Sequence, residues 1–245
     1  MNLGASIRRS YRRLRSKNRN GEQNSYDLLK EVQKLKMLEA KLLTRHIAAQ
    51  GLLPGISSAE FSVYSQFGED RIIQYLLGQV KNLPESFIEF GVETYTEAST
   101  RYLLENNNWR GLILDCDCQA MEALRSQSIF WRHDLTAVGA FIDCDNVNHL
   151  FSDHGFTEKI GLLSIDIDGN DYWVWDSIKV VDLIIVVVEY NSVVGPPIPV
   201  TVPYDPGSAA RNRIIPCCTG VAHSAHYASW HKKRVTRLWA VTALA

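Results

Sequence analysis

The sequence contains no long hydrophobic run and no paired-cysteine motif. Its longest apolar run, Leu183 to Val188, is far shorter than the roughly 20 residues that cross a bilayer. The five cysteines are an odd number and show no CxxC spacing, which argues against a zinc site and for a reducing compartment. The N-terminus does not have the pattern of a signal peptide. We therefore expect a soluble, cytoplasmic protein without a metal site.

Neither sign of charge predominates in the chain as a whole. The formal net charge is -1, so we do not expect the molecule to bind nucleic acid by electrostatic attraction. Residues 1–24 are an exception, because the stretch from Arg8 to Arg19 contains basic residues and no acid. We expect this basic segment to be disordered or bound to a surface.

Residues 25–57 are predicted to form an amphipathic helix, up to about residue 50, and a linker. Leu28, Val32, Leu35 and Leu42 recur at helical spacing, with lysines and glutamates between them. We interpret the helix as an arm for domain packing or self-association. Because of the basic segment before it, peripheral contact with a membrane is the alternative.

Residues 58–206 alternate between apolar runs and amphipathic segments. The expected strands are 86–91, 111–115, a short one at Phe130 and Trp131, 160–167 and 183–189. The expected helices are 65–80, 97–106, one beginning over 121–125, 138–151 and 173–178. This alternation predicts an α/β domain with a doubly wound, mostly parallel sheet that helices cover on both faces.

Four of the five expected strands end in acidic residues. Ligands of open parallel sheets bind at the carboxyl ends of the strands, so these side chains are candidate site residues. Solvated loops also carry acids, and the interpretation therefore depends on the four strand ends together. The acids are Glu89 with Glu93, Asp115, Asp166 with Asp168, and Glu189.

The first and second strand ends favour a particular kind of ligand. Gly91 would let the backbone turn tightly beneath a ligand. Asp115 follows roughly twenty residues later and is placed to accept both hydroxyls of a ribose. A pyrophosphate would require several glycines and no nearby acid, whereas Gly91 stands between Glu89 and Glu93. The pattern favours a nucleoside that carries a cationic group over a dinucleotide.

Several blocks of this region resemble one subgroup of the FkbM-like methyltransferases over roughly residues 58–206. They are FSVYSQFGEDRIIQYLL, FIEFGVETYTEASTRYLLENNNWRGLILD, GLLSIDIDGNDYWVW, VVVEYNSVVGP and VTVPYDP. The resemblance implies the seven-stranded, Rossmann-like methyltransferase fold and S-adenosyl-L-methionine as cofactor. The chain departs from the usual pattern in its first loop, which reads GVETY where a glycine-rich loop would read GxGxG.

The resemblance also implies roles for individual residues. Glu89 and Gly91 would lie in the cofactor loop, and Asp115 would hold the ribose. Asp134 would lie near the adenine, and Asp166 with Asp168 would face the methionine end or the acceptor. Gln66, together with Glu69 and Asp70, would close the pocket from one side.

The expected reaction is methyl transfer to a hydroxyl oxygen of a sugar or another small acceptor. Proximity would supply much of the rate, and Asp168 or Glu189 would act as general base. One alternative is a metal-dependent glycosyltransferase, in which Asp166-Ile167-Asp168 would chelate a metal that holds a sugar nucleotide. Another is an inactive binding or scaffold protein whose N-terminal helix is the partner surface.

Residues 207–245 do not fit the domain that precedes them. The resemblance requires two further strands, an antiparallel pair beside the fifth, yet this tail contains neither a hairpin turn signal nor a pair of strand-like runs. Its histidines and cysteines match no metal-site spacing. We interpret the tail as aberrant, and a shift of reading frame near residues 208–212 is our hypothesis for its origin.

Overall fold

The computed structural model describes residues 25, 27–46, 62–66, 68–167, 169–188 and 203–206. The chain divides into two compact units, Met1–Ala49 and Gln50–Ala245. The first unit contains a helix over residues 27–46, as the leucine spacing predicts. The basic segment and the tail lie outside the described residues, so the disorder, the aberrant tail and the frame shift stay predictions.

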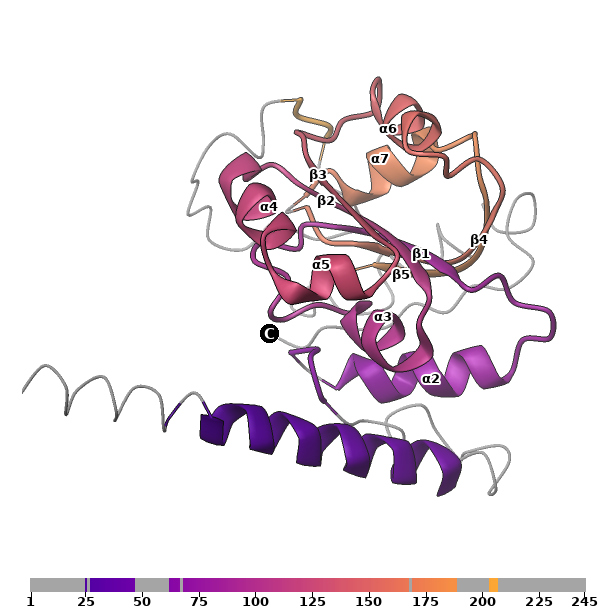
Figure 1. The fold of residues 1–245 in the computed structure, drawn as a ribbon. Helices are drawn as coiled ribbons and strands as arrows, with labels where there is room; N and C mark the ends of the chain where they lie inside the picture. The colour runs from indigo at the N-terminus through magenta and orange to yellow at the C-terminus, as the bar shows by residue number, and fades with distance from the viewer. Residues whose placement is uncertain are drawn as a thin grey trace, which may run out of the picture. The chain divides into compact units, whose positions relative to one another are not determined.

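The second unit contains a sheet of five parallel strands in the order β3-β2-β1-β4-β5 (Figure 1). They are β1 (Ser86–Phe90), β2 (Arg110–Asp115), β3 (Leu135–Gly139), β4 (Lys159–Ile165) and β5 (Asp182–Val188). From β1 the chain moves outward to β2 and β3, and then returns to place β4 on the other side of β1. The predicted doubly wound parallel sheet is confirmed, and its topological switch point lies between β1 and β4.

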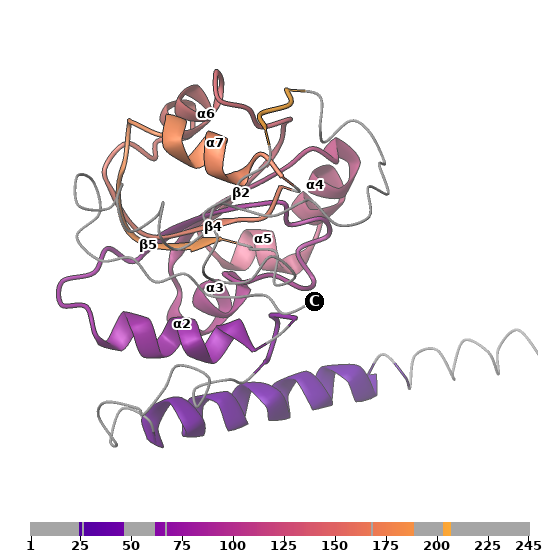
Figure 2. The ribbon, with the colours of Figure 1, turned by 180° about the vertical axis from the view of Figure 1, so that it is seen from behind.

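Six helices of this unit are described, and they cover both faces of the sheet. They are α2 (Glu69–Gly78), α3 (Arg101–Asn107), α4 (Cys118–Arg125), α5 (Ser128–Arg132), α6 (Val147–Asp153) and α7 (Asp171–Ser177). Figures 1 and 2 both show α6 and α7 on one face, with α2, α3 and α5 on the other. Within the described residues, no helix combines the length and the apolarity that crossing a membrane requires.

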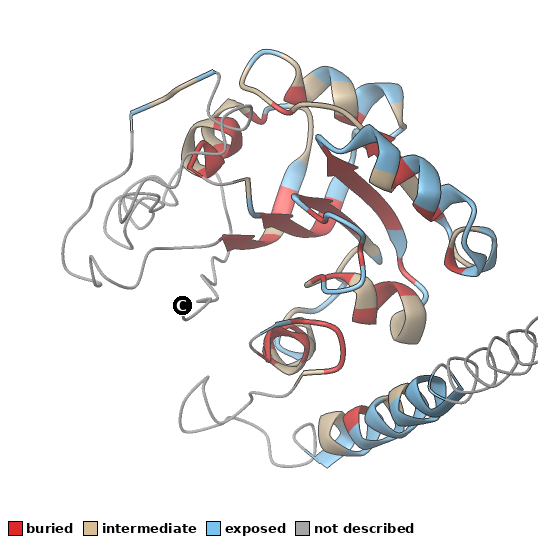
Figure 3. Cartoon of the chain, turned by 90° about the vertical axis from the view of Figure 1, so that its left-hand side faces the viewer, coloured by how far each residue is buried: buried red, intermediate tan, exposed pale blue. Residues whose placement is uncertain are grey.

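The strands are buried almost throughout, which explains their continuous Val, Ile and Leu content (Figure 3). Alternate side chains of β1, such as Ile88 and Phe90, belong to the core cluster that α6 and α7 complete. The Phe90 ring packs on Phe151 of α6 with 5.8 Å between the ring centroids. In a sheet buried on both faces, polar side chains can gather only where the strands end and the loops begin. A functional site is therefore expected at the amino ends or the carboxyl ends of the strands.

The prediction of a strand at Phe130 and Trp131 is wrong. Both residues lie in α5, and the Trp131 side chain is 72% exposed. The third strand is β3, whose Leu135 pairs with Gly111 of β2. The expected helix over 138–151 is also shorter, because Asp143 accepts the backbone N–H groups of Asp145 and Asn146 and so holds a turn before α6.

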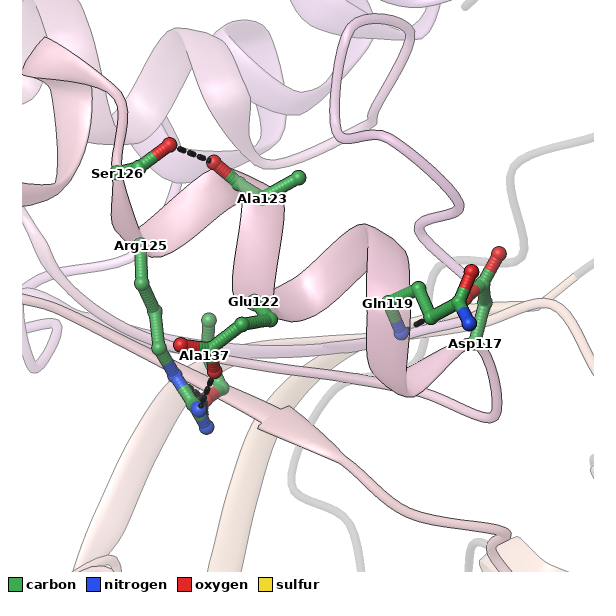
Figure 4. A network of polar contacts seen from close by, with 7 residues as sticks. All are labelled: Asp117, Gln119, Glu122, Ala123, Arg125, Ser126 and Ala137. Atoms are coloured by element: carbon green, nitrogen blue, oxygen red, sulfur yellow. Dashed lines mark hydrogen bonds and ion pairs between the residues drawn. The ribbon is translucent and has the colours of Figure 1, made fainter.

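Helix α4 is fixed at both of its ends by side chains (Figure 4). At its beginning, Asp117 caps the helix by accepting the backbone N–H groups of Gln119 and Ala120. At its end, Arg125 donates from Nε and Nη2 to the carbonyl oxygen of Ala137 in β3, at 3.2 and 2.7 Å. These contacts hold the β2–α4 loop, and therefore the end of β2, in a fixed position.

Candidate functional site

Two neighbouring cavities lie at the carboxyl ends of the central strands, at the switch point. The first has a volume of about 260 Å³ and the second about 340 Å³. Gly91, Glu93 and Asp166 line both, so the cavities meet between the loop after β1 and the loop after β4. In a doubly wound sheet, this is the place where ligands bind.

The first cavity is lined by acids and small polar residues. Its wall contains no Lys, Arg or His among the described residues. The lining residues are Ser65, Gln66, Glu69, Glu89, Gly91, Val92, Glu93, Glu97, Ala98, Ser99, Ser164, Ile165, Asp166, Val187 and Val188. An anionic ligand would meet only like charge here, whereas a cation or a neutral polar molecule would be accepted.

The second cavity has a polar side and an apolar side. Asp115, Cys116, Asn170 and the three shared residues form the polar side. Ala140, Phe141 and Ile142, which follow β3, form the apolar side together with Ile167. An elongated ligand with a hydroxylated part and a flat apolar part would match this division.

Gly91 brings the loop after β1 against the loop after β4. Its φ is 70°, in the left-handed region, and a Cβ at this position would overlap the carbonyl oxygen of Asp166. We expected Gly91 to let the backbone turn tightly beneath a ligand, and its positive φ shows the tight turn. The structure adds a second requirement for glycine, because two backbones of the site touch.

Asp115 ties the ends of β1 and β2 together. Its Oδ2 accepts the backbone N–H of Glu93 at 2.7 Å, and its Oδ1 accepts that of Asp117 at 2.7 Å. The residue is 7% exposed and lines the second cavity. Each carboxylate oxygen has a second lone pair, so Asp115 can still accept a ligand hydroxyl from the cavity side.

Glu89 is a fully buried carboxylate in β1 that holds the approach to α3. Its Oε1 accepts the backbone N–H of Ser99 at 2.8 Å, and its Oε2 accepts that of Thr100 at 3.1 Å and also the Thr100 hydroxyl. Burial raises the pKa of Glu89 from 4.5 to about 7, although these hydrogen bonds oppose the shift. Since both oxygens are engaged by the loop, Glu89 positions the cavity wall.

Asp70 has the same kind of role on the other side of the first cavity. Its Oδ2 accepts the backbone N–H groups of Val63, Tyr64 and Ser65 at 2.7, 2.7 and 2.9 Å. These bonds organise the segment that carries Ser65 and Gln66 to the cavity, and α2 therefore begins at Glu69 instead of residue 65. Burial raises the pKa of Asp70, and the hydrogen bonds partly offset that effect.

The loop after β4 is held by Asp171 and Asn170. The Asp171 carboxylate accepts the backbone N–H groups of Ile167 and Gly169, both at 2.8 Å. The Asn170 side chain donates to the carbonyl of Asp205 at 2.7 Å and accepts the Asp205 N–H at 3.2 Å. Residues 203–206, near the end of the resemblance, therefore lie against a residue of the second cavity.

The structure brings most of the predicted site residues together. Gln66, Glu89, Gly91, Asp115 and Asp166 all line one cavity or both. Glu69 lines the first cavity as well, whereas Asp70 is buried and is not among the lining residues. Asp168 and Glu189, the expected general bases, lie outside the described residues.

Asp134 does not join the site. It directly precedes β3, so it lies at the amino ends of the strands, on the edge opposite the cavities. Its carboxylate is 3.8 Å from Nε of Arg110, the first residue of β2. The resemblance implied a place near the adenine for Asp134, and this position at the amino ends of the strands does not agree with it.

Sequence reasoning missed two groups of lining residues. Phe141 and Ile142 form the apolar wall, and correct placement of β3 would have identified them as residues that follow a strand. Glu97, Ser99 and Ser164 line the first cavity. Ser164 lies inside β4 among apolar neighbours, and a polar residue within a buried run is a signal that could have found it.

No metal-binding group is present among the residues that the structure describes. The acids of the two cavities are spread over several loops, and nowhere in the described ranges do three His, Cys, Asp or Glu side chains gather closely enough to hold an ion. Comparisons of the chain with protein-family models, with curated proteins and with solved structures found no match.

Proposed function

We propose that this chain binds S-adenosyl-L-methionine and transfers its methyl group to a hydroxyl oxygen of a sugar or another small acceptor. The observation that carries the proposal is the pair of cavities at the switch point, which are lined by carboxylates and lack a basic side chain among the described lining residues. A sulfonium is one of the few cofactor groups that gains from such surroundings.

The described residues fit the parts of this cofactor. The Asp115 carboxylate would accept the ribose hydroxyls, and Phe141 with Ile142 would contact the adenine. Glu93 and Asp166 line both cavities and would face the cationic part of the molecule. When bound, the cofactor supplies an electrophilic methyl group.

The protein's own contribution is to position the acceptor and to remove its proton. The first cavity would hold the acceptor, because it extends from the shared residues toward Ser65, Gln66 and Ser164. A carboxylate near the acceptor would take the hydroxyl proton as general base. We propose Asp168 or Glu189 for that role, because both oxygens of Glu89 are engaged by Ser99 and Thr100.

Titration calorimetry with the cofactor and with its demethylated product tests the proposal. We expect both to bind, and Asp115→Ala to weaken binding by about 10- to 100-fold, as loss of one or two charged hydrogen bonds predicts. Asp134→Ala is the matched control, since it removes a carboxylate from the opposite edge. The proposal fails if the folded chain binds neither compound at about millimolar concentration, or if Asp134→Ala has the larger effect.

Two further measurements, nucleotide-sugar binding with manganese and turnover on hydroxyl acceptors, separate the two alternatives. Manganese-dependent binding of a nucleotide sugar, abolished by Asp166→Ala, would favour a glycosyltransferase. The described lining offers no Lys or Arg for a diphosphate, so that function depends on a metal held by Asp166 and Asp168. Cofactor binding without turnover on any hydroxyl acceptor would favour an inactive binding protein.

A further inference from the structure

The helix over residues 27–46 presents a row of large apolar side chains to solvent. These residues are between 42% and 67% exposed, and we refer to them as the apolar face: Leu28, Leu29, Val32, Leu35, Leu38 and Leu42. A helix of this length extends about 30 Å. Monomeric proteins rarely leave a continuous apolar surface of this kind uncovered, because its burial is favourable.

The spacing of the apolar face is that of a helix which packs against another helix. Leu28, Leu35 and Leu42 repeat every seven residues, and Val32 follows Leu28 by four. In heptad notation the three leucines occupy d positions and Val32 an a position. Glu39 occupies the next a position and is also exposed. Any partner must therefore accommodate a carboxylate in the middle of the seam.

The charges beside the apolar face decide which partner fits. Glu31 and Arg45 flank one side at g positions, and Lys36 flanks the other at an e position. Glu31 already accepts from Lys34 at 2.6 Å, but both side chains are largely exposed, so this pair is weak and leaves Glu31 able to bind a second cation. Glu31 and Glu39 oppose burial of this face among lipid chains.

A second copy of the same helix satisfies these charges when it runs antiparallel. Residues at a then face residues at d, so Val32 packs on Leu42 of the second copy, and the twofold axis lies near residue 37. In that register Glu31 lies beside Arg45 of the second copy, and Lys36 beside Glu39. Each ion pair occurs twice. A parallel dimer would instead set Glu39 against Glu39.

We propose that the helix over residues 27–46 docks on the same helix of a second copy of this chain, in antiparallel orientation, through the apolar face and the reciprocal pairs Glu31–Arg45 and Lys36–Glu39. This interface joins two molecules and does not depend on the proposed methyl transfer.

Sedimentation velocity of the full chain over a range of concentrations tests the proposal. We expect a reversible dimer, which Leu42→Lys abolishes because it puts a cation against Val32 of the other copy at both ends of the seam. Arg45→Glu and Glu31→Arg should each raise the dissociation constant about tenfold, and the double variant should restore it, since the pair is then reversed in both places. Lys41→Glu, an equal charge reversal on the opposite face, should leave the dimer unchanged.

A cross-linking measurement gives a second test, which does not depend on charge reversal. Leu38 lies beside Leu38 of the second copy only in the antiparallel register, so Leu38→Cys should form a disulfide dimer under mild oxidation. The unchanged chain and Lys41→Cys give the background from the other cysteines. A chain that stays monomeric at about 100 µM overturns the proposal. The proposal is also overturned if the double variant Glu31→Lys with Lys36→Glu restores the dimer, because a parallel dimer predicts that result. A monomer that sediments with anionic vesicles overturns it as well.

Discussion

Four carboxylates around the site accept hydrogen bonds from backbone N–H groups. Asp70, Glu89, Asp115 and Asp171 each accept at least two such bonds, and the acceptor and donor are up to 22 residues apart. Buried backbone N–H groups must be paired, and loops cannot pair with one another as strands do. The acids therefore build the loops that form the cavities, and Asp166 and Glu93 are the ones presented to both cavities.

Gly91→Ala should be strongly destabilising. The new methyl group would overlap the carbonyl of Asp166, and the backbone is in the left-handed region. We expect a loss of about 3–5 kcal/mol in the free energy of unfolding, measured by chemical denaturation, together with weaker cofactor binding. Gly78→Ala is the control, because nothing lies within 4 Å of its position, and it should be neutral or stabilising by up to about 1 kcal/mol. Equal effects at the two glycines would contradict the close approach of the two loops.

The raised pKa of Glu89 predicts a pH dependence of stability. Between pH 4.5 and about 7 the folded state keeps this proton while the unfolded state releases it. The free energy of unfolding should therefore fall as the pH rises through this window, by roughly 3 kcal/mol. Glu89→Gln removes the titrating group, so its stability should change less over the same range. Parallel pH curves for the two proteins, measured by urea unfolding, would show that Glu89 is not the source.

Among the elements, the segment before α2 depends on one side chain. Asp70→Ala removes the acceptor of three backbone N–H groups, so hydrogen exchange at Val63, Tyr64 and Ser65 should accelerate and the free energy of unfolding should fall by about 2–4 kcal/mol. Asp70→Asn keeps one carbonyl oxygen and should retain most of the protection. If Asn and Ala accelerate exchange equally, the carboxylate oxygen does not organise the segment.

The start of helix α3 is set by a carboxylate that binds the backbone N–H groups just before it. Helix α3 begins at Arg101 and not at residue 97, because Glu89 binds the N–H groups of Ser99 and Thr100 just before it. Residues 92–99 are thereby left as a loop whose side chains, Glu93, Glu97 and Ser99, reach the first cavity. The late start of the helix and the composition of the cavity wall have a common cause.

For the molecule as a whole, β5 is the last strand that the structure describes, and its one partner among the described strands is β4. A strand of this composition is normally paired on both sides, since an open apolar edge promotes aggregation. The frame-shift hypothesis predicts that adding or removing one base near the codons for residues 208–212 encodes two further strand-like runs. A chain expressed from that frame should melt at least about 5 °C higher, as roughly 1 kcal/mol of added stability predicts. A lower melting temperature, measured by calorimetry, would count against the hypothesis.

The sequence by itself determined the fold class and the main positions of four strands. Largely apolar runs such as 160–165 and 183–188 are typical of strands in a doubly covered sheet, and the acids that follow them then lie at the carboxyl ends of the strands. Glu89, Gly91, Asp115 and Asp166 could be placed in this way, whereas Gln66 was placed by the resemblance alone. The same reasoning failed at 130–139, where a five-residue strand with a partly buried Thr136 has a weaker pattern than the Ile-Phe-Trp run before it.

Only the tertiary structure decided what each site residue does. Position 91 must be glycine because the backbone of Asp166, just after β4 and about 75 residues away in the chain, lies against it, and no local pattern encodes that approach. The strand pairing likewise decides that Glu89 and Asp70 are buried and that they accept loop N–H groups. It also decides that Asp134 lies at the amino ends of the strands, away from the cavities. Periodicity reports which residues are inside, because burial acts on every apolar side chain. Periodicity does not predict which hydrogen-bond donor meets which acceptor, because these pairs depend on distances that the arrangement of the whole sheet sets.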